Sequence, residues 1–499
     1  MAPAKGPAIC SRSELAKLQD PSLVRAEAFV GGEWVAASSG RRFDVTDPAT
    51  LETVGSVPDM DAGDVRRAID VASEAFSSWK TTTARQRSVL LRRWYELMVA
   101  NKDDLARLVT LECGKPLVQA VEEVYYAASF VEWNAEEAKR MEGDVLQSPT
   151  GDTRILVMKQ PVGVVGAITP YNFPCAMITR KAAALAAGCT LVARPAYETP
   201  LSALALAELA RRAGFPPGVF NVVTCAAANT PEVGLELTTN PLVRKITFTG
   251  STTVGKLLTR QASSTMKKIS MELGGNAPFI VFEDGDVDKA VGDLVVAKFR
   301  NSGQTCICAN RVYVHESVYD SFVAKFAALV REKMRVGHGL QDGTTFGPMI
   351  TERGAVKIED QLQRALAAGA KVVLGGRRAE DLGLAGHFFE PTVLVDVTDD
   401  VPMSCEETFG PLCPVYKFAS EEEVLRRANS VSVGLAGYFY SRDVARVFRV
   451  AEALEVGMVC ANTAILGSDV FPFGGVKESG VGREGSRYGI DEYLNMKSI

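Results

Sequence analysis

The chain has 499 residues, of which 47% are apolar and 23% are charged, and its formal net charge is −5. That length allows two or three domains, each with its own core. The slight acidic excess, 60 Asp and Glu against 55 Lys and Arg, argues against a surface that binds nucleic acid or anionic membranes. In addition, no apolar run reaches transmembrane length. We therefore expect neither nucleic acid nor a membrane as a partner.

Cysteine and histidine are sparse. Ten Cys residues without a CxxC pair fit a reducing compartment better than a disulfide scaffold. The three His residues lie apart from one another, so we expect no metal site. Residues 1–20 mix basic and acidic side chains without an apolar stretch, which predicts no secretory signal. We therefore expect the cytoplasm, with the mitochondrial matrix as the alternative.

The first third of the chain is predicted to be mostly helical. A short extended segment at 28–34 comes first, and apolar side chains then recur at helical spacing in 68–79 and 90–98. A third amphipathic stretch covers roughly 115–140. No repeat or low-complexity linker separates this region from the next one.

Between 153 and 273 short β-branched runs alternate with helical patterns. The predicted strands are 154–159, 162–168, 190–193, 219–223, 245–249 and 268–273, and the predicted helices are 175–187, 200–213, 231–238 and one from 252. This alternation is typical of a parallel sheet with right-handed crossovers. Ligands of such sheets bind at the carboxyl ends of the strands.

A second α/β series is predicted from 278 to about 462. It begins with a strand at 278–282, a helix at 286–300, a strand at 311–315 and a helix at 317–335. The segments 143–160 and 484–499 are expected to be extended arms, one use of which is to offer an edge strand to another subunit.

A glycine turn follows the strand 245–249. Gly250-Ser251 opens a helix there, and backbone N–H groups at such a helix start bind phosphate. A Walker A loop is disfavoured because Leu257 stands where Ser or Thr must bind Mg²⁺. A dinucleotide site and a plain structural turn remain as readings of this segment alone.

Cys306 and Glu272 are the candidate nucleophile and base. Cys306 follows the polar turn Asn301-Ser302-Gly303-Gln304-Thr305, which favours a presented thiol over a buried one. A thiol needs help to ionise, and with His scarce a carboxylate is the natural helper. Glu272 ends an apolar strand directly before a Gly pair, although a surface acid at a strand end is the ordinary alternative.

Together these residues resemble the aldehyde dehydrogenase superfamily. The motifs that carry the resemblance, in family order, are Ile168-Thr169-Pro170-Tyr171-Asn172-Phe173-Pro174, Phe248-Thr249-Gly250-Ser251, Glu272-Leu273-Gly274-Gly275, Gly303-Gln304-Thr305-Cys306, Glu407-Thr408-Phe409-Gly410-Pro411 and Phe473-Gly474-Gly475-Val476-Lys477-Glu478-Ser479-Gly480. The resemblance implies an α/β fold with three parts. These are a Rossmann-like nucleotide-binding domain (24–141 with 162–272), an α/β catalytic domain (273–462) and a small β oligomerisation arm (142–161 with 480–499) of a homodimer or homotetramer.

The resemblance also implies a mechanism. The Cys306 thiolate attacks an aldehyde, and the side-chain amide of Asn172 with the Cys306 N–H stabilises the oxyanion. Hydride leaves to a nicotinamide, and Glu272 activates the water that hydrolyses the thioester. Because relatives that use coenzyme A commonly lack this Glu, we expect a free acid as the product.

The cofactor is expected to be NAD or NADP. By similarity the residues that bind it are Thr169, Tyr171, Asn172, Arg194, Tyr197, Gly250, Ser251, Leu273, Glu407 and Phe409. Tyr197 stands where the family typically has a Glu that binds the adenosine ribose and repels a 2′-phosphate. Arg194 can pair with that phosphate, so we expect NADP to be accepted or preferred, with Glu198 as a substitute for the missing Glu.

The substrate is expected to be an acidic semialdehyde. The segments 177–181 and 298–301 resemble the succinate-semialdehyde dehydrogenases, in which two arginines, here Arg180 and Arg300, bind the distal carboxylate. The family's third contact, a Ser, falls on Gly467, so Ser468 is its candidate substitute. Surface salt bridges are the ordinary alternative for both arginines.

The predicted activity is therefore NAD(P)-dependent oxidation of succinate semialdehyde to succinate. Glutarate semialdehyde is the alternative substrate, because one methylene changes binding little. A non-catalytic or P-loop nucleotide-binding protein is the alternative of another class. Cys308 is a candidate redox partner of Cys306, and a bystander thiol is the competing interpretation.

Overall fold

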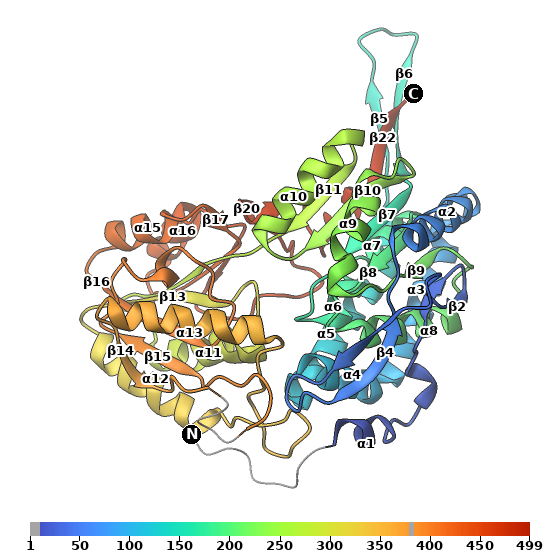
Figure 1. Cartoon of the computed structure of the whole chain (residues 1–499). Helices are drawn as coiled ribbons and strands as arrows, with labels where there is room; N and C mark the ends of the chain where they lie inside the picture. Colours follow the sequence, from blue (N-terminus) through green and yellow to red (C-terminus); the bar gives the residue numbers. More distant parts are fainter. Residues whose placement is uncertain (1–9, 379–383) are drawn as a thin grey trace.

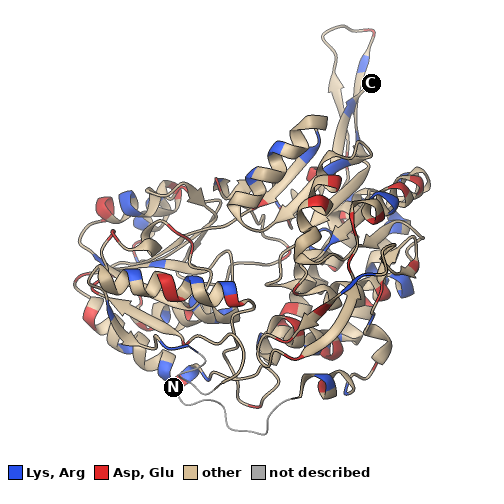
Figure 2. Cartoon of the chain, in the orientation of Figure 1, with Lys and Arg blue, Asp and Glu red and all other residues tan. Residues whose placement is uncertain are grey.

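The computed structural model describes residues 10–378 and 384–499 and has two α/β parts with a protruding arm (Figure 1). Positive and negative side chains alternate over both parts and gather in no single region (Figure 2). The described residues contain no helix long and apolar enough to cross a membrane. The first nine residues of the segment 1–20 lie outside the described part.

The first part is built on an eight-stranded sheet. In spatial order its strands are β2 (Glu33–Val35), β1 (Ala28–Val30), β9 (Phe220–Val222), β8 (Thr190–Arg194), β7 (Val164–Ile168), β10 (Val243–Thr249), β11 (Lys268–Glu272) and β21 (Gly480–Val481). The five strands from β9 to β11 are parallel, which confirms the predicted sheet. Both edges are antiparallel: β1 pairs with β9, and β21 pairs with β11.

The helices of this part follow the predicted spacing. They are α1 (Ser11–Leu15), α2 (Ala62–Trp79), α3 (Ala84–Ala100), α4 (Lys102–Cys113), α5 (Leu117–Glu137), α8 (Pro200–Ala213), α9 (Thr230–Thr239) and α10 (Thr252–Ala262). Capping boxes start two of them, Asp61 with Asp64 at α2 and Thr83 with Gln86 at α3. Helix α3 packs against α5 and α8, and these three helices share one apolar core.

The helix predicted at 175–187 is in fact two helices. Helix α6 (Pro174–Thr179) ends before Arg180, and α7 (Ala182–Ala187) begins after Lys181. The apolar pattern runs across the break, so spacing alone predicts one helix. Arg180 and Lys181 lie at this break, and both are buried in the active-site region described below.

The second part contains a seven-stranded sheet. Its order is β14 (Lys371–Leu374), β15 (Thr392–Val395), β16 (Leu412–Phe418), β13 (Ala309–His315), β12 (Ala277–Val281), β18 (Ala436–Tyr440) and β19 (Met458–Ala461). All neighbours are parallel except β14 and β15. The accompanying helices are α11 (Val287–Phe299), α12 (Tyr319–Lys333), α13 (Glu352–Ala367), α15 (Glu421–Asn429) and α16 (Val444–Ala453).

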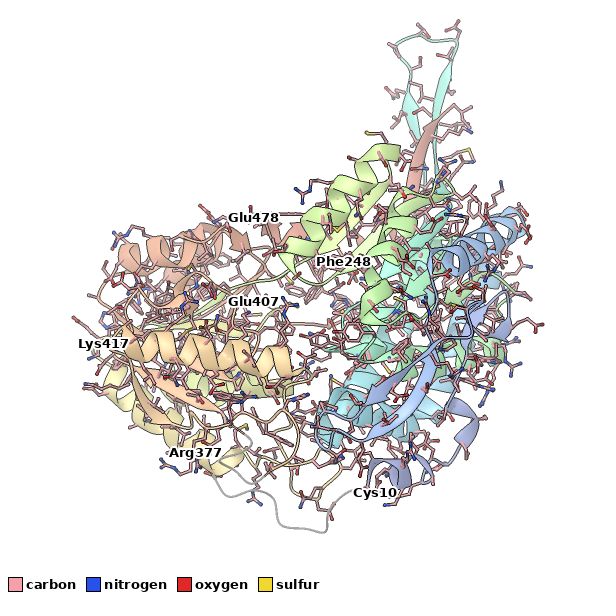
Figure 3. The ribbon with its side chains drawn as sticks, in the orientation of Figure 1. Cys10, Phe248, Arg377, Glu407, Lys417 and Glu478 are labelled. Carbon is pink, nitrogen blue, oxygen red and sulfur yellow. The ribbon has the colours of Figure 1, made fainter. Side chains whose placement is uncertain are left out.

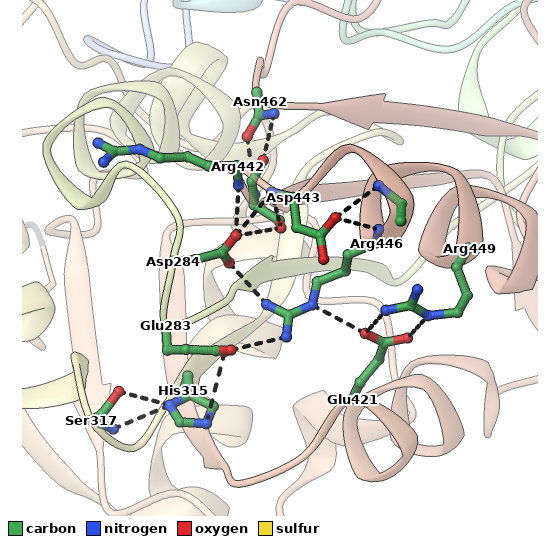
Figure 4. A network of polar contacts seen from close by, with 12 residues as sticks. Glu283, Asp284, His315, Ser317, Glu421, Arg442, Asp443, Arg446, Arg449 and Asn462 are labelled. Carbon is green, nitrogen blue, oxygen red and sulfur yellow. Dashed lines mark hydrogen bonds and ion pairs between the residues drawn. The ribbon is translucent and has the colours of Figure 1, made fainter.

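A polar network ties the loops after β12 and β18 to α15 and α16 (Figure 4). The Arg446 guanidinium contacts Glu283, Asp284 and Glu421 at 2.9, 2.9 and 3.1 Å. Asp284 also accepts a hydrogen bond from Ser441 Oγ at 2.8 Å. Because one guanidinium contacts three carboxylates, this network holds the two loops and the two helices together.

The arm is a three-stranded antiparallel sheet of β5 (Asp144–Gln147), β6 (Arg154–Pro161) and β22 (Leu494–Ser498) that projects from the first part (Figure 1). The prediction of an extended tail over 484–499 is wrong for its first half. A 3₁₀ turn spans Gly489–Tyr493 and buries Ile490 and Tyr493 against the core. Short hairpins or pairs complete the chain: β3 (Arg42–Thr46) with β4 (Thr53–Pro58), and β17 (Val433–Gly434) with β20 (Val476–Lys477).

Candidate active site

Cys306 lies where two cavities meet. A cavity of about 230 Å³ and a larger cleft of about 560 Å³ share Cys306 and Met177 in their walls. The preceding turn has left-handed backbone at Asn301 (φ 49°) and Ser302 (φ 56°). Non-glycine residues adopt that conformation only when their surroundings enforce it. The turn therefore presents the thiol in a fixed place.

Side-chain hydrogen bonds of Gln304 hold this turn. Its Oε1 accepts from the Ile350 N–H at 2.9 Å, and its Nε2 donates to the Asn301 carbonyl at 3.1 Å. Its own backbone carbonyl accepts from Asn172 Nδ2 at 2.9 Å. The last bond joins the loop after β7 to the Cys306 loop, so the amide and the thiol predicted to act together are fixed relative to each other.

The thiol is protonated at rest. Burial raises the pKa of Cys306 to about 12. A nucleophile at this position requires a proton acceptor or a neighbouring positive charge. The Cys308 thiol is fully buried and donates to the Lys298 carbonyl at 3.5 Å, and burial raises its pKa as well.

Glu272 is a buried carboxyl without a hydrogen-bond partner. It is 3% exposed at the end of β11, and neither of its side-chain oxygens is bonded within the described part of the chain. Burial, and then the negative charge of Glu484, raise the pKa of Glu272 well above its ordinary value. A carboxyl with a raised pKa in a cleft beside a thiol is suited to proton transfer.

Three charged groups act on Glu272: Arg180 and Lys181, at the break between α6 and α7, and Glu484. The Glu484 carboxylate contacts Lys181 Nζ and lies 2.6 Å from Arg180 Nε, and Lys181 Nζ donates to Thr249 Oγ1 at 3.0 Å. Burial acts to raise the pKa of Glu484, but the charges of Arg180 and Lys181 outweigh it and hold that pKa below its ordinary value. Sequence reasoning missed Glu484 because nothing in its neighbourhood marks it as buried.

The backbone of Asn172 is fixed by a buried cation. Its carbonyl accepts from Lys115 Nζ at 2.8 Å and from Asn301 Nδ2 at 3.0 Å. Lys115 is 2% exposed and forms an ion pair with Glu123, which is 1% exposed. Removing such a pair from water costs free energy, which its hydrogen bonds, including the one to the Asn172 carbonyl, help to offset. Neither residue was predicted.

Glu123 extends this support to helix α6. Its second carboxylate oxygen accepts from the Cys175 N–H at 2.9 Å and faces the Ala176 N–H at 3.4 Å, at the N-terminus of α6. A carboxylate there satisfies the free N–H groups and the helix dipole. One buried ion pair therefore positions both Asn172 and helix α6, which ends just before Arg180.

The smaller cavity brings the two predicted arginines together. Arg180 and Arg300 both line it, each over an aromatic ring: Arg180 lies 4.0 Å from the centroid of Phe473 and Arg300 lies 5.0 Å from that of Phe173. Arg180 Nη2 is buried without a hydrogen-bond partner among the described residues. An oxyanion in the cavity would supply one.

The third predicted contact is not part of this cavity. Ser468 is exposed and does not line it, whereas Gly467 does. The Gly467 backbone has φ 125°, a conformation that side chains rarely adopt, and it carries the following residue outwards.

The larger cleft holds most of the predicted cofactor residues. Tyr171, Asn172, Tyr197, Gly250, Ser251, Leu273, Glu407 and Phe409 all line it. Ser251 caps α10, accepting from the Val254 N–H at 3.4 Å, and so leaves a helix N-terminus open to phosphate. Glu407 lies on the second part and Phe248 on the first, near where the two meet (Figure 3).

The cleft fits a dinucleotide. A Cβ on Gly274 would lie 2.6 Å from Glu407 Oε2, so a side chain there would displace this carboxylate from its present place in the cleft wall. Glu407 Oε1 accepts from the Gly275 N–H at 3.2 Å, and burial raises its pKa to about 7. The Phe409 backbone is left-handed (φ 52°), and its ring meets Tyr171 edge-on at 6.2 Å.

Two predicted cofactor residues lie behind the cleft wall. Thr169 and Arg194 are buried and do not line the cleft. The Arg194 guanidinium donates to Thr230 Oγ1 and to Cys225 Sγ, both within the first part. The cationic side chains that do line the cleft with Tyr197 are Arg353 and Lys357 of α13, from the other part of the molecule. The described residues contain no cluster of three or more metal-ligating side chains.

Comparison with known proteins confirms the predicted resemblance. The aldehyde dehydrogenase family model matches residues 34–499. The chain is 55% identical to a glutarate-semialdehyde dehydrogenase of Pseudomonas putida, covering 97% of this chain and 99% of that one. It is also 55% identical to an NADP(+) succinate-semialdehyde dehydrogenase of Escherichia coli, covering 96% and 98%. A crystal structure of succinate-semialdehyde dehydrogenase from Burkholderia pseudomallei superposes with a TM-score of 0.95 at 54% identity, over 97% and 99%.

Alkylation of Cys306 tests its protonation state. With a pKa of about 12, the thiolate fraction rises about tenfold per pH unit throughout the range in which the protein is stable. We expect the iodoacetamide reaction of the Cys306 peptide, followed by mass spectrometry, to accelerate from pH 7 to 10 without a plateau. The exposed Cys10 and Cys405 provide internal references. A plateau below pH 9 would contradict the proposed burial effect.

A double-mutant cycle tests the ion pair beneath Asn172. Lys115→Met leaves Glu123 buried without its cation, which is expected to destabilise the protein by about 3–5 kcal/mol. Adding Glu123→Gln removes the unpaired charge, so the double variant should recover part of that loss in a urea titration. Strictly additive effects of the two substitutions would show that the pair is not coupled.

Proposed function

The chain belongs to the aldehyde dehydrogenase family, and we propose that it oxidises succinate semialdehyde to succinate with NAD or NADP. The observation that supports this substrate is the small cavity at Cys306, in which Arg180 and Arg300 can both bind an anion. The names of the relatives support an acidic semialdehyde, since two of them act on succinate and glutarate semialdehydes.

The Cys306 thiol first loses its proton to solvent in the cleft, favoured by the nearby positive charge of Arg180. The thiolate then adds to the aldehyde carbon and forms a tetrahedral hemithioacetal oxyanion. Asn172 Nδ2 has one hydrogen bonded to the Gln304 carbonyl and a second one free for this oxyanion. A donor of this kind contributes about 10²–10³ in rate. The bound cofactor supplies the acceptor for the hydride that the oxyanion expels, and a thioester remains on Cys306.

Glu272 completes the cycle. Its carboxylate takes a proton from water, the hydroxide adds to the thioester carbon, and the C–S bond breaks to return the thiolate and release succinate. The buried, unbonded carboxyl supports this role because no other described group competes for its proton by a hydrogen bond. The positive charges of Arg180 and Lys181 act to lower the pKa of Glu272, against the larger effects of burial and of Glu484.

Glutarate semialdehyde is the second candidate substrate. One extra methylene in a cavity changes discrimination by about 1–3 kcal/mol, which the two arginines alone do not provide. The 55% identity to a glutarate-semialdehyde dehydrogenase favours keeping this substrate in any assay.

We further propose that the chain acts as a homodimer or homotetramer. Strands β5, β6 and β22 of the arm expose large apolar side chains, namely Val145, Leu146, Leu156, Met158 and Met496. Exposed apolar strands at a free sheet edge are suited to pairing with a second copy. The corresponding division of the chain is a cofactor domain (24–141 with 162–272), a catalytic domain (273–462) and the arm (142–161 with 480–499).

We propose that it acts in the cytoplasm, with the mitochondrial matrix as the alternative. The ten cysteines are all free, which supports a reducing compartment. The thiol of Cys308 remains a candidate redox partner of Cys306, which a reducing compartment would keep reduced.

A three-aldehyde panel tests the substrate. We expect initial rates with NAD and NADP to favour the succinate or glutarate semialdehyde over uncharged butanal by at least tenfold in kcat/KM. Arg300→Ala should raise KM for the anionic aldehydes about ten- to hundredfold, because a charge-assisted hydrogen bond is lost. Butanal is the control, and an equal effect on all three would reduce Arg300 to a structural role.

Rapid mixing of Glu272→Gln tests the base. This variant should release up to one equivalent of reduced cofactor per site and then slow by about 10²–10⁴, because the thioester persists. In the unchanged enzyme the hydrolysis rate should rise with pH across the neutral range, since Glu272 with its raised pKa must lose its proton to act. A variant without a burst would place Glu272 in hydride transfer instead.

A further inference from the structure

Tyr126 of helix α5 forms a wall of the cavity that holds the two arginines. Its ring meets Phe130 edge-on at 5.0 Å, and Phe130 in turn lies 6.0 Å below the Arg180 guanidinium. The aromatic pair therefore helps to fix the position of the tyrosine ring at the cavity wall.

The hydroxyl faces the backbone of Gly467 on the opposite wall. A Cβ built on Gly467 would lie 3.4 Å from Tyr126 Oη, its nearest neighbour. Gly467 has no side chain and a backbone (φ 125°) that disfavours one, so the space beside the hydroxyl stays open. The exposed Ser468 does not fill it.

The hydroxyl has no hydrogen-bond partner within 10–378 and 384–499, although the cavity around it is lined mainly by apolar side chains. Tyr126 is half-buried, so its hydroxyl faces the cavity and can donate to a ligand oxygen that enters there. Burial raises the pKa of Tyr126, so the group keeps its proton and remains a donor at every working pH.

We propose that the Tyr126 hydroxyl is the third donor to the distal carboxylate of the substrate, beside Arg180 and Arg300. This inference rests on the proposed function, because it requires an anionic aldehyde in this cavity. A carboxylate has about four acceptor sites, so two guanidinium groups and one hydroxyl can bind it together. Tyr126 would thus take the place of a hydroxyl on the opposite wall, where Gly467 offers none.

Tyr126→Phe removes the hydroxyl and keeps the ring that packs on Phe130. The matched control is Tyr125→Phe, which removes a hydroxyl from the neighbouring, 48% exposed position outside the cavity. We expect Tyr126→Phe to raise KM for succinate semialdehyde, and Ki for succinate, about ten- to hundredfold, as expected for a hydrogen bond to a charged group. Values for butanal should remain within about twofold, and Tyr125→Phe should change neither aldehyde.

Two outcomes overturn the inference and are distinct from failure of the proposed function. An equal loss for succinate semialdehyde and butanal in Tyr126→Phe would assign the residue to packing. An unchanged KM and succinate Ki would show that the carboxylate binds elsewhere. If instead the unsubstituted enzyme itself has no preference for the anionic aldehydes over butanal, the proposed substrate fails, whatever the Tyr126 variant does.

Discussion

The hydrogen bond from Asn172 Nδ2 to the Gln304 carbonyl joins the two α/β parts at the point where the chemistry is proposed to take place. It links a loop after a strand of the first sheet to the turn that carries Cys306 on the second part. Both ends are reinforced: Gln304 by bonds to Asn301 and Ile350, and Asn172 by the buried ammonium of Lys115. An oxyanion donor must be within hydrogen-bond distance of the carbonyl that the thiol attacks. A domain interface that slid by an ångström would lose that geometry, and this network prevents it.

The balance of buried charge explains why an anionic substrate suits the cavity. Arg180 and Lys181 are two buried cations that share a single ionised partner, Glu484. Glu272 does not compensate for the second cation, because burial and Glu484 keep its pKa high. The cluster therefore carries an excess positive charge, and Arg300 adds another at the cavity wall. A substrate carboxylate neutralises charge that the protein has already buried, whereas an uncharged aldehyde leaves it uncompensated.

Local pattern was sufficient for the strands that present the site, because buried parallel strands read as short β-branched runs ended by polar turns. Glu272 was predicted from its position at the end of such a strand, whereas Asn172, which follows another, was predicted from the family resemblance. The break at Arg180-Lys181 could not be predicted in the same way. It depends on Glu484, which lies 303 residues away from Lys181 in the chain. The residues around Glu484 show no helical or strand periodicity that would predict a buried position. Lys115 and Glu123 escaped prediction for the same reason. Lys115 lies in the loop before α5 and Glu123 lies within α5, where charged residues are ordinarily exposed, and only the folded chain buries the two together.

The choice between NAD and NADP depends on which cationic side chains line the cleft beside Tyr197. Arg194 looked suited to a 2′-phosphate, but its donors are directed to Thr230 and Cys225 within the first part. The cations that line the cleft with Tyr197 come from α13 of the second part, and Lys357 already donates to the Glu407 carbonyl at 2.6 Å. Arg353 is exposed and lies at the N-terminal end of that helix, where the helix dipole adds to its charge. The cationic side chains beside Tyr197 therefore come from the second part of the molecule, whereas Tyr197 and the helix start at Ser251 belong to the first.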